Sequence, residues 1–401
     1  MDGSATRAVY EFGDFHVDAL QRLLRSRVDG KPITLTSKAF ETLLFLVEHR
    51  GELIDKAALM KAIWPNVVVE ENNLNQNISA LRRVLGESAT EHRFIVTVPG
   101  RGYRFVADVQ VLPGGARPAE RPQGTATSRT RQAIQFCTTA DGVNLAYAIT
   151  GQGRALVKTA HWLSHVEHDW ESPVYHHLLK DLSRNHRLIR YDHRGNGLSD
   201  RDVQDISLEA FVTDLETVAD AAGLERFALM GQSMGVPVSI AYAARHPERL
   251  THLVLFGGFA KGTRTDDEVQ AVATLMKVHW GQDNPSFRQM WTTALMPDAT
   301  IEEQNWFNEQ QRLTTSTENA IRTLFAIHVM DVTELLSRVK VPTLVLHARD
   351  DAVIPLDAGR RMAAAIPGAR FVQLDGRNHL LLGHDPASVR FKAELSAFLS
   401  E

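Results

Sequence analysis

A segment rich in proline and glycine divides the chain into two parts whose apolar patterns differ. Residues 112–130 read LPGGARPAERPQGTATSRT, with three prolines, three glycines and no apolar periodicity. Such a composition is typical of a linker rather than of a helix or a strand. We therefore predict a first domain over residues 8–110, a flexible linker over residues 111–131 and a second domain over residues 132–401.

The composition narrows the classes of protein to which the chain can belong. Cys137 is the single cysteine, so an internal disulfide is impossible and a reducing compartment is expected. No apolar run approaches the roughly 18 residues of a membrane span, and the N-terminus lacks the apolar core of a signal peptide. We expect a cytoplasmic protein with no membrane partner.

In the first domain, one predicted helix joins an apolar stripe to an unusual polar face. Leu74, Ile78, Leu81 and Leu85 recur at helical spacing and form the stripe. The opposite face carries amides, a hydroxyl and guanidinium groups, namely Asn72, Asn75, Gln76, Ser79, Arg82 and Arg83. An ordinary solvated face would instead mix Glu with Lys. Asn and Gln can pair with adenine, and Arg can pair with guanine or with a phosphate.

A hairpin follows this helix, and its turn carries one more cation. The sequence Pro99-Gly100-Arg101-Gly102 places Arg101 at a tip suited to a phosphate or to the minor groove. Residues 1–110 carry 14 basic and 14 acidic residues, so affinity for DNA must come from locally gathered Arg. Residues 132–401 carry 26 basic and 33 acidic residues, which disfavours nucleic-acid binding by the second domain.

Residues 8–108 resemble the winged-helix DNA-binding domain of OmpR/PhoB-type regulators. The segments LTSKAFETLLFLVEHRG, LRRVLG and TVPGRGYRF carry the resemblance. It implies an α+β winged helix-turn-helix fold with an antiparallel sheet, three helices and a C-terminal hairpin. It also implies that the third helix enters the major groove of double-stranded promoter DNA. Only seven residues precede the module, so we expect no phosphorylatable receiver ahead of it.

In the second domain, strand-like and helical segments alternate, which predicts a mostly parallel sheet with helices on both faces. FALM is a short apolar strand and VPVSIAYAARHPERL is a helix, so the motif GQSMG falls on the turn between them. Glycines at both ends of this motif relieve crowding and project the Ser233 hydroxyl. Ser233 is therefore the candidate nucleophile.

A serine hydroxyl needs a base, because it is a poor nucleophile at neutral pH. His379 follows the strand-like segment RFVQL and is the candidate base. The segment PTLVLHARDDAVIP offers Asp350 and Asp351 as the carboxylate that orients the imidazole. The order Ser, Asp, His along the chain is that of α/β-hydrolases.

Residues 132–401 resemble the α/β-hydrolase superfamily throughout, most clearly in HWLSHVEHDWESP and YDHRGNGLSDR. The resemblance favours Asp351 over Asp350, because the acid usually stands four residues before a proline. It implies an oxyanion hole formed by the N–H groups of Met234 and Leu163. The chain has His161-Trp162 where many α/β-hydrolases have His-Gly, and this departure argues against ordinary turnover.

The resemblance also implies a substrate class and the absence of a cofactor. We expect an ester, lactone, amide or related substrate, with no organic cofactor and no metal. Residues 260–335 lack the core pattern and are predicted to form a helical cap, which is aromatic and suited to a small apolar ligand. His161, His165 and His168 cluster with Glu167, but we predict a histidine-rich loop rather than a metal site.

Taken together, the two patterns favour a one-component transcription regulator that acts as a homodimer. Its hydrolase domain is expected to bind, and to hydrolyse, a small apolar ester-like molecule. Two alternatives stay open: a serine hydrolase with an accessory DNA-binding module, and a catalytically silent ligand sensor. The sequence identifies neither the ligand, nor the operator, nor the sign of regulation.

Overall fold

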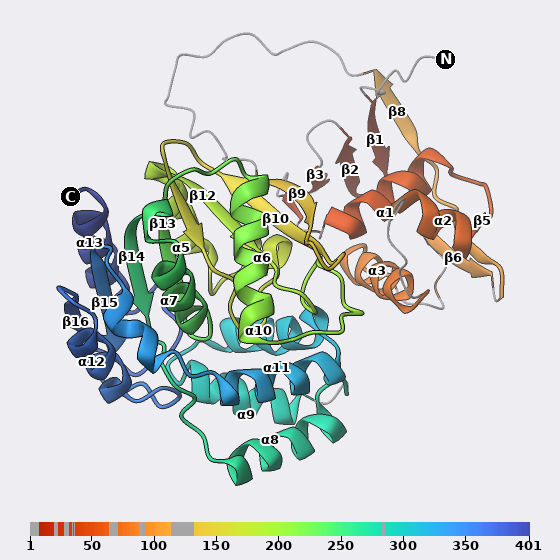
Figure 1. Ribbon diagram of the computed structural model, residues 1–401. Coiled ribbons are helices and arrows are strands. Elements are labelled where there is room, and N and C mark those ends of the chain that lie inside the picture. Colours follow the sequence, from red (N-terminus) through yellow and green to blue (C-terminus); the bar gives the residue numbers. More distant parts are fainter. Residues whose placement is uncertain are drawn as a thin grey trace. The chain divides into compact units, whose positions relative to one another are not determined.

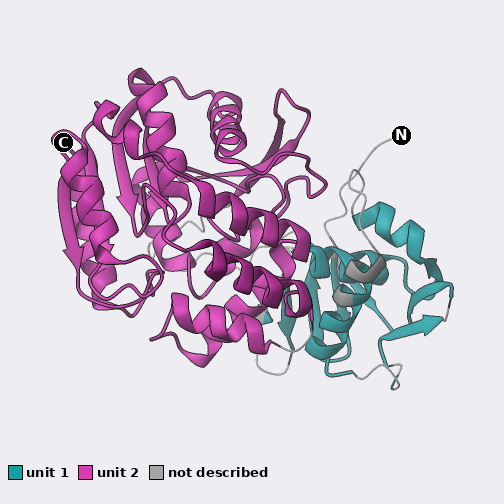
Figure 2. Ribbon diagram, turned by 60° about the horizontal axis from the view of Figure 1, so that its bottom comes forward, with its two compact units in different colours: residues 1–126 teal, residues 127–401 magenta. Residues whose placement is uncertain are grey.

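The computed structural model describes residues 8–19, 23–27, 32–33, 35, 37–63, 71–87, 91, 93–98, 100–113, 132–282 and 285–401 (Figure 1). The chain forms two compact units, Met1–Ala126 and Thr127–Glu401 (Figure 2). The boundary between them falls inside the predicted linker, of which residues 114–131 lie outside the described residues. No helix within these described ranges is long and apolar enough to cross a membrane.

Within its described residues, the first unit has a five-stranded antiparallel sheet, three helices and a smaller three-stranded sheet. The large sheet has the order β4-β3-β2-β1-β8, formed by Pro32–Ile33, Leu23–Ser26, Phe15–Asp18, Ala8–Phe12 and Gln110–Pro113. The helices are α1 (Ser37–Glu48), α2 (Lys56–Ile63) and α3 (Glu71–Val84). The small sheet has the order β5-β7-β6, formed by Ile54–Asp55, Gly102–Phe105 and Ile95–Val98. These elements confirm the predicted winged helix.

Local sequence explains several of these elements. Helix α2 begins after Asp55, whose Oδ1 accepts the N–H of Ala58 at 2.7 Å, as an N-cap does. The predicted apolar stripe of α3 is buried, since each of its four residues is at most 2% exposed. Strand β8 pairs with β1 as far as Pro113. The predicted linker therefore begins too early, because residues 111–113 complete the sheet.

The second unit contains an eight-stranded sheet with the order β16-β15-β14-β13-β11-β12-β10-β9. In that order, the strands are Arg370–Leu374, Thr343–Ala348, Leu250–Phe256, Phe227–Gln232, Arg154–Lys158, His186–Tyr191, Asn144–Thr150 and Ala133–Thr138. All neighbouring strands are parallel except β10, which runs antiparallel to both β9 and β12. The mostly parallel α/β-hydrolase sheet is thus confirmed, and its central strands are buried because helices cover both faces.

In the described part of the second unit, six helices flank this sheet and four more form a cap. The flanking helices are α4 (Val166–Glu171), α5 (His176–Asn185), α6 (Leu208–Ala221), α7 (Gly235–Arg245), α12 (Leu356–Ala365) and α13 (Pro386–Leu399). The cap contains α8 (Asp266–His279), α9 (Ser286–Leu295), α10 (Ile301–Thr314) and α11 (Thr317–Val329), which lie together in Figure 1. Short 3-10 helices, η1 (Pro247–Arg249) and η2 (Thr333–Arg338), complete the unit.

The cap is inserted between β14 and β15, and its two ends are tied together. The N–H of Gly262 donates to the carbonyl of Met330 at 2.9 Å, and the N–H of Val332 donates to that of Ala260 at 2.7 Å. Capping boxes begin α8 at Thr265 and α10 at Thr300. All four cap helices fall within the predicted range of residues 260–335.

Candidate active site and DNA-binding face

Ser233 lies on a sharp turn between β13 and α7. Its φ is +53°, a left-handed conformation that a non-glycine residue adopts at a cost of roughly 1–3 kcal/mol. A Cβ added to Gly235 would approach Thr159 Oγ1 to 2.3 Å, and one added to Gly231 would approach Ser239 Oγ to 2.6 Å. Only glycine fits these two flanking positions. The turn therefore presents the Ser233 side chain, which is partly exposed, at the end of the strand.

A chain of hydrogen bonds joins the three residues that the sequence motifs suggested. His379 Nε2 lies 2.9 Å from Ser233 Oγ, and His379 Nδ1 lies 2.7 Å from Asp351 Oδ2. Asp351 follows β15 and His379 follows β16, so all three residues lie beyond the carboxyl ends of parallel strands. This is the geometry in which an imidazole can take a proton from a serine hydroxyl.

Asp351 is buried and its surroundings favour the ionised carboxylate, whereas the alternative acid, Asp350, is exposed. Burial alone would raise the pKa of Asp351, but the His379 imidazole holds that pKa below its ordinary value. Two backbone donors act in the same direction: Val353 N–H at 2.9 Å and Ile354 N–H at 3.0 Å from Oδ1. A charged Asp351 keeps the proton of His379 on Nδ1 and leaves Nε2 facing the serine.

The two predicted oxyanion residues border the same turn and the loop beside it. Met234 directly follows Ser233, at the start of α7, and is buried. Leu163 lies in the loop after β11, which we call the oxyanion loop (residues 159–165). Leu163 has a φ of +65°, and its carbonyl accepts a hydrogen bond from Gln310 Nε2 of cap helix α10 at 3.1 Å. The cap thus holds the peptide group that follows the predicted donor.

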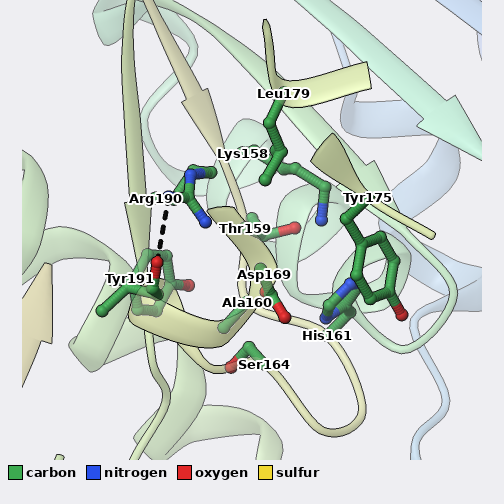
Figure 3. A pocket seen from close by; sticks show the side chains of 11 residues that line it. Lys158, Thr159, Ala160, His161, Ser164, Asp169, Tyr175, Leu179, Arg190 and Tyr191 are labelled. Carbon is green, nitrogen blue, oxygen red and sulfur yellow. Dashed lines mark hydrogen bonds between the residues drawn. The ribbon is translucent and has the colours of Figure 1, made fainter. Parts of the chain in front are cut away.

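Beneath the oxyanion loop lies a buried charged cluster that the sequence motifs did not reveal. Lys158, Asp169 and Arg190 are each at most 6% exposed, and Figure 3 shows them with His161 around a cavity of about 10 Å³. Asp169 accepts the His165 N–H at 3.3 Å on one oxygen and Gln310 Nε2 at 2.8 Å on the other. We call these three charged residues the loop-support cluster.

Burial controls the ionisation of this cluster. It raises the pKa of Asp169 to about 6 and lowers the pKa of Lys158 to about 8. The mutual attraction of the two groups opposes both shifts, and the Arg190 guanidinium also favours the Asp169 carboxylate. Between those two pKa values, both members of the pair are charged. The sequence offers one signal of a buried cation here, the lysine within the apolar segment ALVKTA, but it does not indicate the partners of that lysine.

Trp162, the residue that departs from the usual His-Gly pattern, packs against the cap. Its ring centre lies 5.8 Å from that of Trp280 and 6.1 Å from that of Trp291. Trp280 is fully buried, while Trp291 is partly buried. The oxyanion loop and the cap therefore share an aromatic contact in addition to the Gln310 hydrogen bonds.

The histidine-rich part of the oxyanion loop has structural contacts. His161 is buried, and burial lowers its pKa well below the ordinary value, so its ring is neutral. His165 Nδ1 accepts the N–H of His168 at 3.3 Å and caps α4. Among the described residues, no three His, Cys, Asp or Glu side chains are placed to share a metal ion.

In the first unit, the polar face of α3 divides into inward and outward side chains. Arg82 donates from Nη2 to the Ile95 carbonyl at 2.7 Å and to Thr97 Oγ1 at 2.9 Å, so it binds the wing strand β6. Asn75 Oδ1 accepts from the Tyr103 hydroxyl at 2.7 Å. The exposed predicted residues are Ser79, Arg83 and Arg101, while the side chains of Asn72 and Gln76 lie outside the described residues.

Comparisons with known proteins agree with both folds. Residues 165–386 match the family described as serine aminopeptidase, S33, and residues 30–105 match the family described as transcriptional regulatory protein, C terminal. A putative carbamate hydrolase, RutD, from Pseudomonas savastanoi is 29% identical over 228 residues, 55% of this chain and 86% of that protein. The non-heme chloroperoxidase CPO-A1 from Kitasatospora aureofaciens is 28% identical over 67% of this chain and all of that protein.

Solved structures show the same fold for the second unit. An esterase from a Rhodococcus species is 26% identical, with a TM-score of 0.56, and the match covers 67% of this chain and 98% of the esterase. A hydrolase from Pseudomonas aeruginosa, 24% identical with a TM-score of 0.58, covers 69% of this chain with its entire length. Because the S33 match spans more than half of the sequence, the chain belongs to the serine aminopeptidase S33 family of α/β-hydrolases and carries, ahead of that domain, the winged helix of OmpR/PhoB-type regulators.

Proposed function

We propose that this chain is a DNA-binding regulator whose hydrolase domain binds and hydrolyses a small ester- or lactone-like molecule through Ser233. The observation that carries the proposal is the hydrogen-bonded series Ser233–His379–Asp351, with distances of 2.9 Å and 2.7 Å. The esterase and carbamate hydrolase among the similar proteins support a carbonyl substrate. The aromatic contact of Trp162, Trp280 and Trp291 favours a substrate with an apolar body.

The proposed reaction is acyl transfer to serine followed by hydrolysis. His379 Nε2 takes the proton of Ser233 as Oγ attacks the substrate carbonyl carbon. The N–H groups of Met234 and Leu163 hold the negative oxygen of the tetrahedral intermediate. His379 then gives its proton to the leaving alkoxide, and the acyl group stays on Ser233. A water molecule gives a proton to His379 Nε2 and attacks the acyl carbon. The bond from that carbon to Ser233 Oγ then breaks, Oγ takes the proton back from His379, and the acid is released.

For the winged helix, we propose that α3 enters the major groove of promoter DNA. The exposed Ser79 and Arg83 lie on its outer face, and Arg101 lies at the wing tip. Asn75 and Arg82 instead make contacts within the domain, which position α3 relative to the wing. Asn72 and Gln76 stay in the proposal as base-reading residues. Two copies of the chain, bound to a repeated half-site, would give a homodimeric regulator.

A fluorophosphonate probe tests the nucleophile, because it reacts only with an activated serine. We expect the full-length protein to be labelled stoichiometrically, and the Ser233→Ala and His379→Ala variants not to be labelled. Peptide mapping locates the adduct. An unlabelled but folded wild-type protein would overturn the hydrolase part, and ligand-dependent DNA binding would then favour the silent sensor.

Selection from a random pool of duplexes tests the DNA-binding part. At about 150 mM salt, we expect the full-length protein to enrich a repeated sequence. Arg83→Ala and Arg101→Ala should weaken binding, and each should lower the salt dependence if it loses a phosphate contact. Absence of any enriched sequence would contradict the regulator part and leave a hydrolase with an accessory module.

A further inference from the structure

Arg264, at the start of the cap, is a cation that has no hydrogen-bonded acceptor among the described residues. It lies between the end of β14 and the start of α8, and its side chain is partly buried. Its guanidinium carbon lies 5.1 Å from the centre of the Trp291 ring, within the range of a cation–π contact. In the described part of the chain, no carboxylate or carbonyl pairs with this guanidinium. Glu268, the nearby acid, is exposed and engaged in the capping box at Thr265.

Three contacts connect Arg264 to residues next to the proposed catalytic residues, two of them through Trp291. Trp291, on which it stacks, lies one helical turn, about 6 Å, before Leu295 on α9. The carbonyl of Leu295 accepts the His379 N–H at 2.9 Å. Trp291 also contacts Trp162, the neighbour of the predicted oxyanion donor. Trp291 thus links the guanidinium to the helix that binds the His379 backbone and to the oxyanion loop.

The third contact is a small cavity of about 20 Å³ that Arg264 shares with Ile354. The N–H of Ile354 donates to Asp351 Oδ1, so one residue that lines this cavity also binds the carboxylate of the proposed triad. Its other walls are mainly apolar, including Phe259, Leu324 and Ile327, and no acidic residue lines it. His328 also lines the cavity, with its Nε2 2.7 Å from Asp266 Oδ1. The space suits one or two water-sized groups, about the size of a carboxylate.

A guanidinium in this position is poorly solvated, and its N–H groups can donate hydrogen bonds to a ligand. Burial lowers the pKa of Arg264, because the charged form has lost part of its hydration. The planar fork of a guanidinium matches a carboxylate in a two-point hydrogen bond, which is among the stronger polar contacts in proteins. The Trp291 ring, 5.1 Å from the guanidinium carbon, offers an apolar surface to the rest of the ligand.

We propose that Arg264 binds a carboxylate of the substrate, so that Ser233 acts on esters or lactones whose apolar body ends in an anionic oxygen group. This inference rests on the proposed function, because it names the substrate class of the same site. The carboxylate is bound and not transformed. The bonds made and broken are those of the Ser233 reaction.

Matched pairs of esters test the proposal. The acidic series consists of mono-4-nitrophenyl esters of succinic, glutaric and adipic acids, and the neutral series consists of 4-nitrophenyl esters with acyl chains of equal length. The measured quantity is the ratio of kcat/KM for the acidic ester to that for its neutral partner. We expect a ratio of at least about ten for the best spacer in the wild-type protein. Arg264→Met should lower it to about one, and Arg264→Lys should give an intermediate value.

Lys261→Met is the matched control, because Lys261 is an exposed cation three residues earlier that pairs with Asp331 at 3.0 Å. It should keep the wild-type ratio. A ratio near one in the wild-type protein, or an unchanged ratio in Arg264→Met, would overturn the inference. Turnover of the neutral esters would still support the proposed function in that case.

A binding measurement separates the inference from catalysis. In the Ser233→Ala background, monomethyl glutarate should bind in a calorimetric titration, and Arg264→Met should weaken that binding at least tenfold. Equal binding by both proteins, or no binding by either, would overturn the inference even if fluorophosphonate labels Ser233. If fluorophosphonate does not label Ser233 but monomethyl glutarate still binds in an Arg264-dependent way, only the proposed hydrolase activity is overturned.

Discussion

Gln310 joins the cap to the oxyanion loop, and replacing it with methionine removes that link with little change in volume. Its Nε2 donates to Asp169 Oδ1 at 2.8 Å and to the Leu163 carbonyl at 3.1 Å, and the side chain is 1% exposed. Its Oε1 has no hydrogen-bond partner within the described residues. The substitution Gln310→Met therefore deletes two bonds and leaves no new unpaired group on residue 310.

The size of the effect follows from the two acceptors. A hydrogen bond to a charged group contributes about 1.5–3 kcal/mol and one to a neutral carbonyl about 0.5–1.5 kcal/mol. The variant should thus lose about 2–4.5 kcal/mol in the free energy of unfolding of the second unit. If the oxyanion loop then fails to present the Leu163 N–H, kcat should fall by up to about 10²–10³, the effect of losing one oxyanion donor. The KM for a neutral ester should change little.

Steady-state hydrolysis of a 4-nitrophenyl ester at pH 7.5 measures kcat and KM, and urea denaturation of the same variants measures the free energy of unfolding. Gln304→Met is the control, since Gln304 lies on the same helix and its hydrogen bonds stay within the cap, to Ala299 and Gln289. It should leave kcat within about threefold of wild type. A raised KM with an unchanged kcat in Gln310→Met, or the same loss of kcat in both variants, would refute the positioning role.

Three further predictions follow from individual contacts. Asp351→Asn should lower kcat by about 10³–10⁴ at unchanged fold, because His379 loses the group that fixes its tautomer, and single-turnover kinetics checks this. Arg82→Ala should destabilise the winged helix by about 1.5–3 kcal/mol, whereas exposed Arg83→Ala should change stability by less than about 0.5 kcal/mol; thermal denaturation of the full chain compares them. Because burial raises the pKa of Asp169 from 3.8 to about 6, the folded protein keeps a proton that the unfolded chain releases. Stability contributed by that proton is therefore lost as the pH rises from about 4 to 6. Between pH 4.5 and pH 7 this loss is about 2 kcal/mol, and urea denaturation at those two pH values should show that Asp169→Asn removes it.

Ser233, Asp351 and His379 could be proposed as a triad from the sequence because each follows a strand with a recognisable pattern. An apolar strand, a GxSxG turn and a helix specify the position of Ser233. Asp351 and His379 each follow a short strand-like segment in the chain order of the fold. The structure brings the three side chains within hydrogen-bond distance, and it separates Asp351 from the exposed Asp350.

The loop-support cluster could not be predicted, because its members become neighbours only through strand pairing. Lys158 and Arg190 lie opposite each other on β11 and β12, a register that no local pattern encodes. Asp169 comes from α4, and the Gln310 that binds it lies 141 residues further along the chain. The long-range contact between cap and loop has no periodic signal in the sequence.

The polar face of α3 shows a second feature that helical periodicity in the sequence cannot predict. Helical spacing placed Arg82 on the polar side of α3, but periodicity does not tell which neighbouring element covers that side. The wing strand β6 lies against it, so Arg82 is used within the domain while Arg83 stays exposed. Likewise, the prolines and glycines after residue 112 led us to assign residues 111–113 to the linker. Strand β8 instead pairs along an edge of the sheet as far as Pro113.

The most direct test of the central claim is the pre-steady-state hydrolysis of 4-nitrophenyl butyrate by the full-length protein. If Ser233 is the nucleophile, mixing should release a burst of nitrophenolate close to one equivalent per chain, and intact mass spectrometry should show an added butyryl group on Ser233. Ser233→Ala should show neither the burst nor the adduct. Steady release without a burst or an adduct, or a burst that survives in Ser233→Ala, would contradict the account.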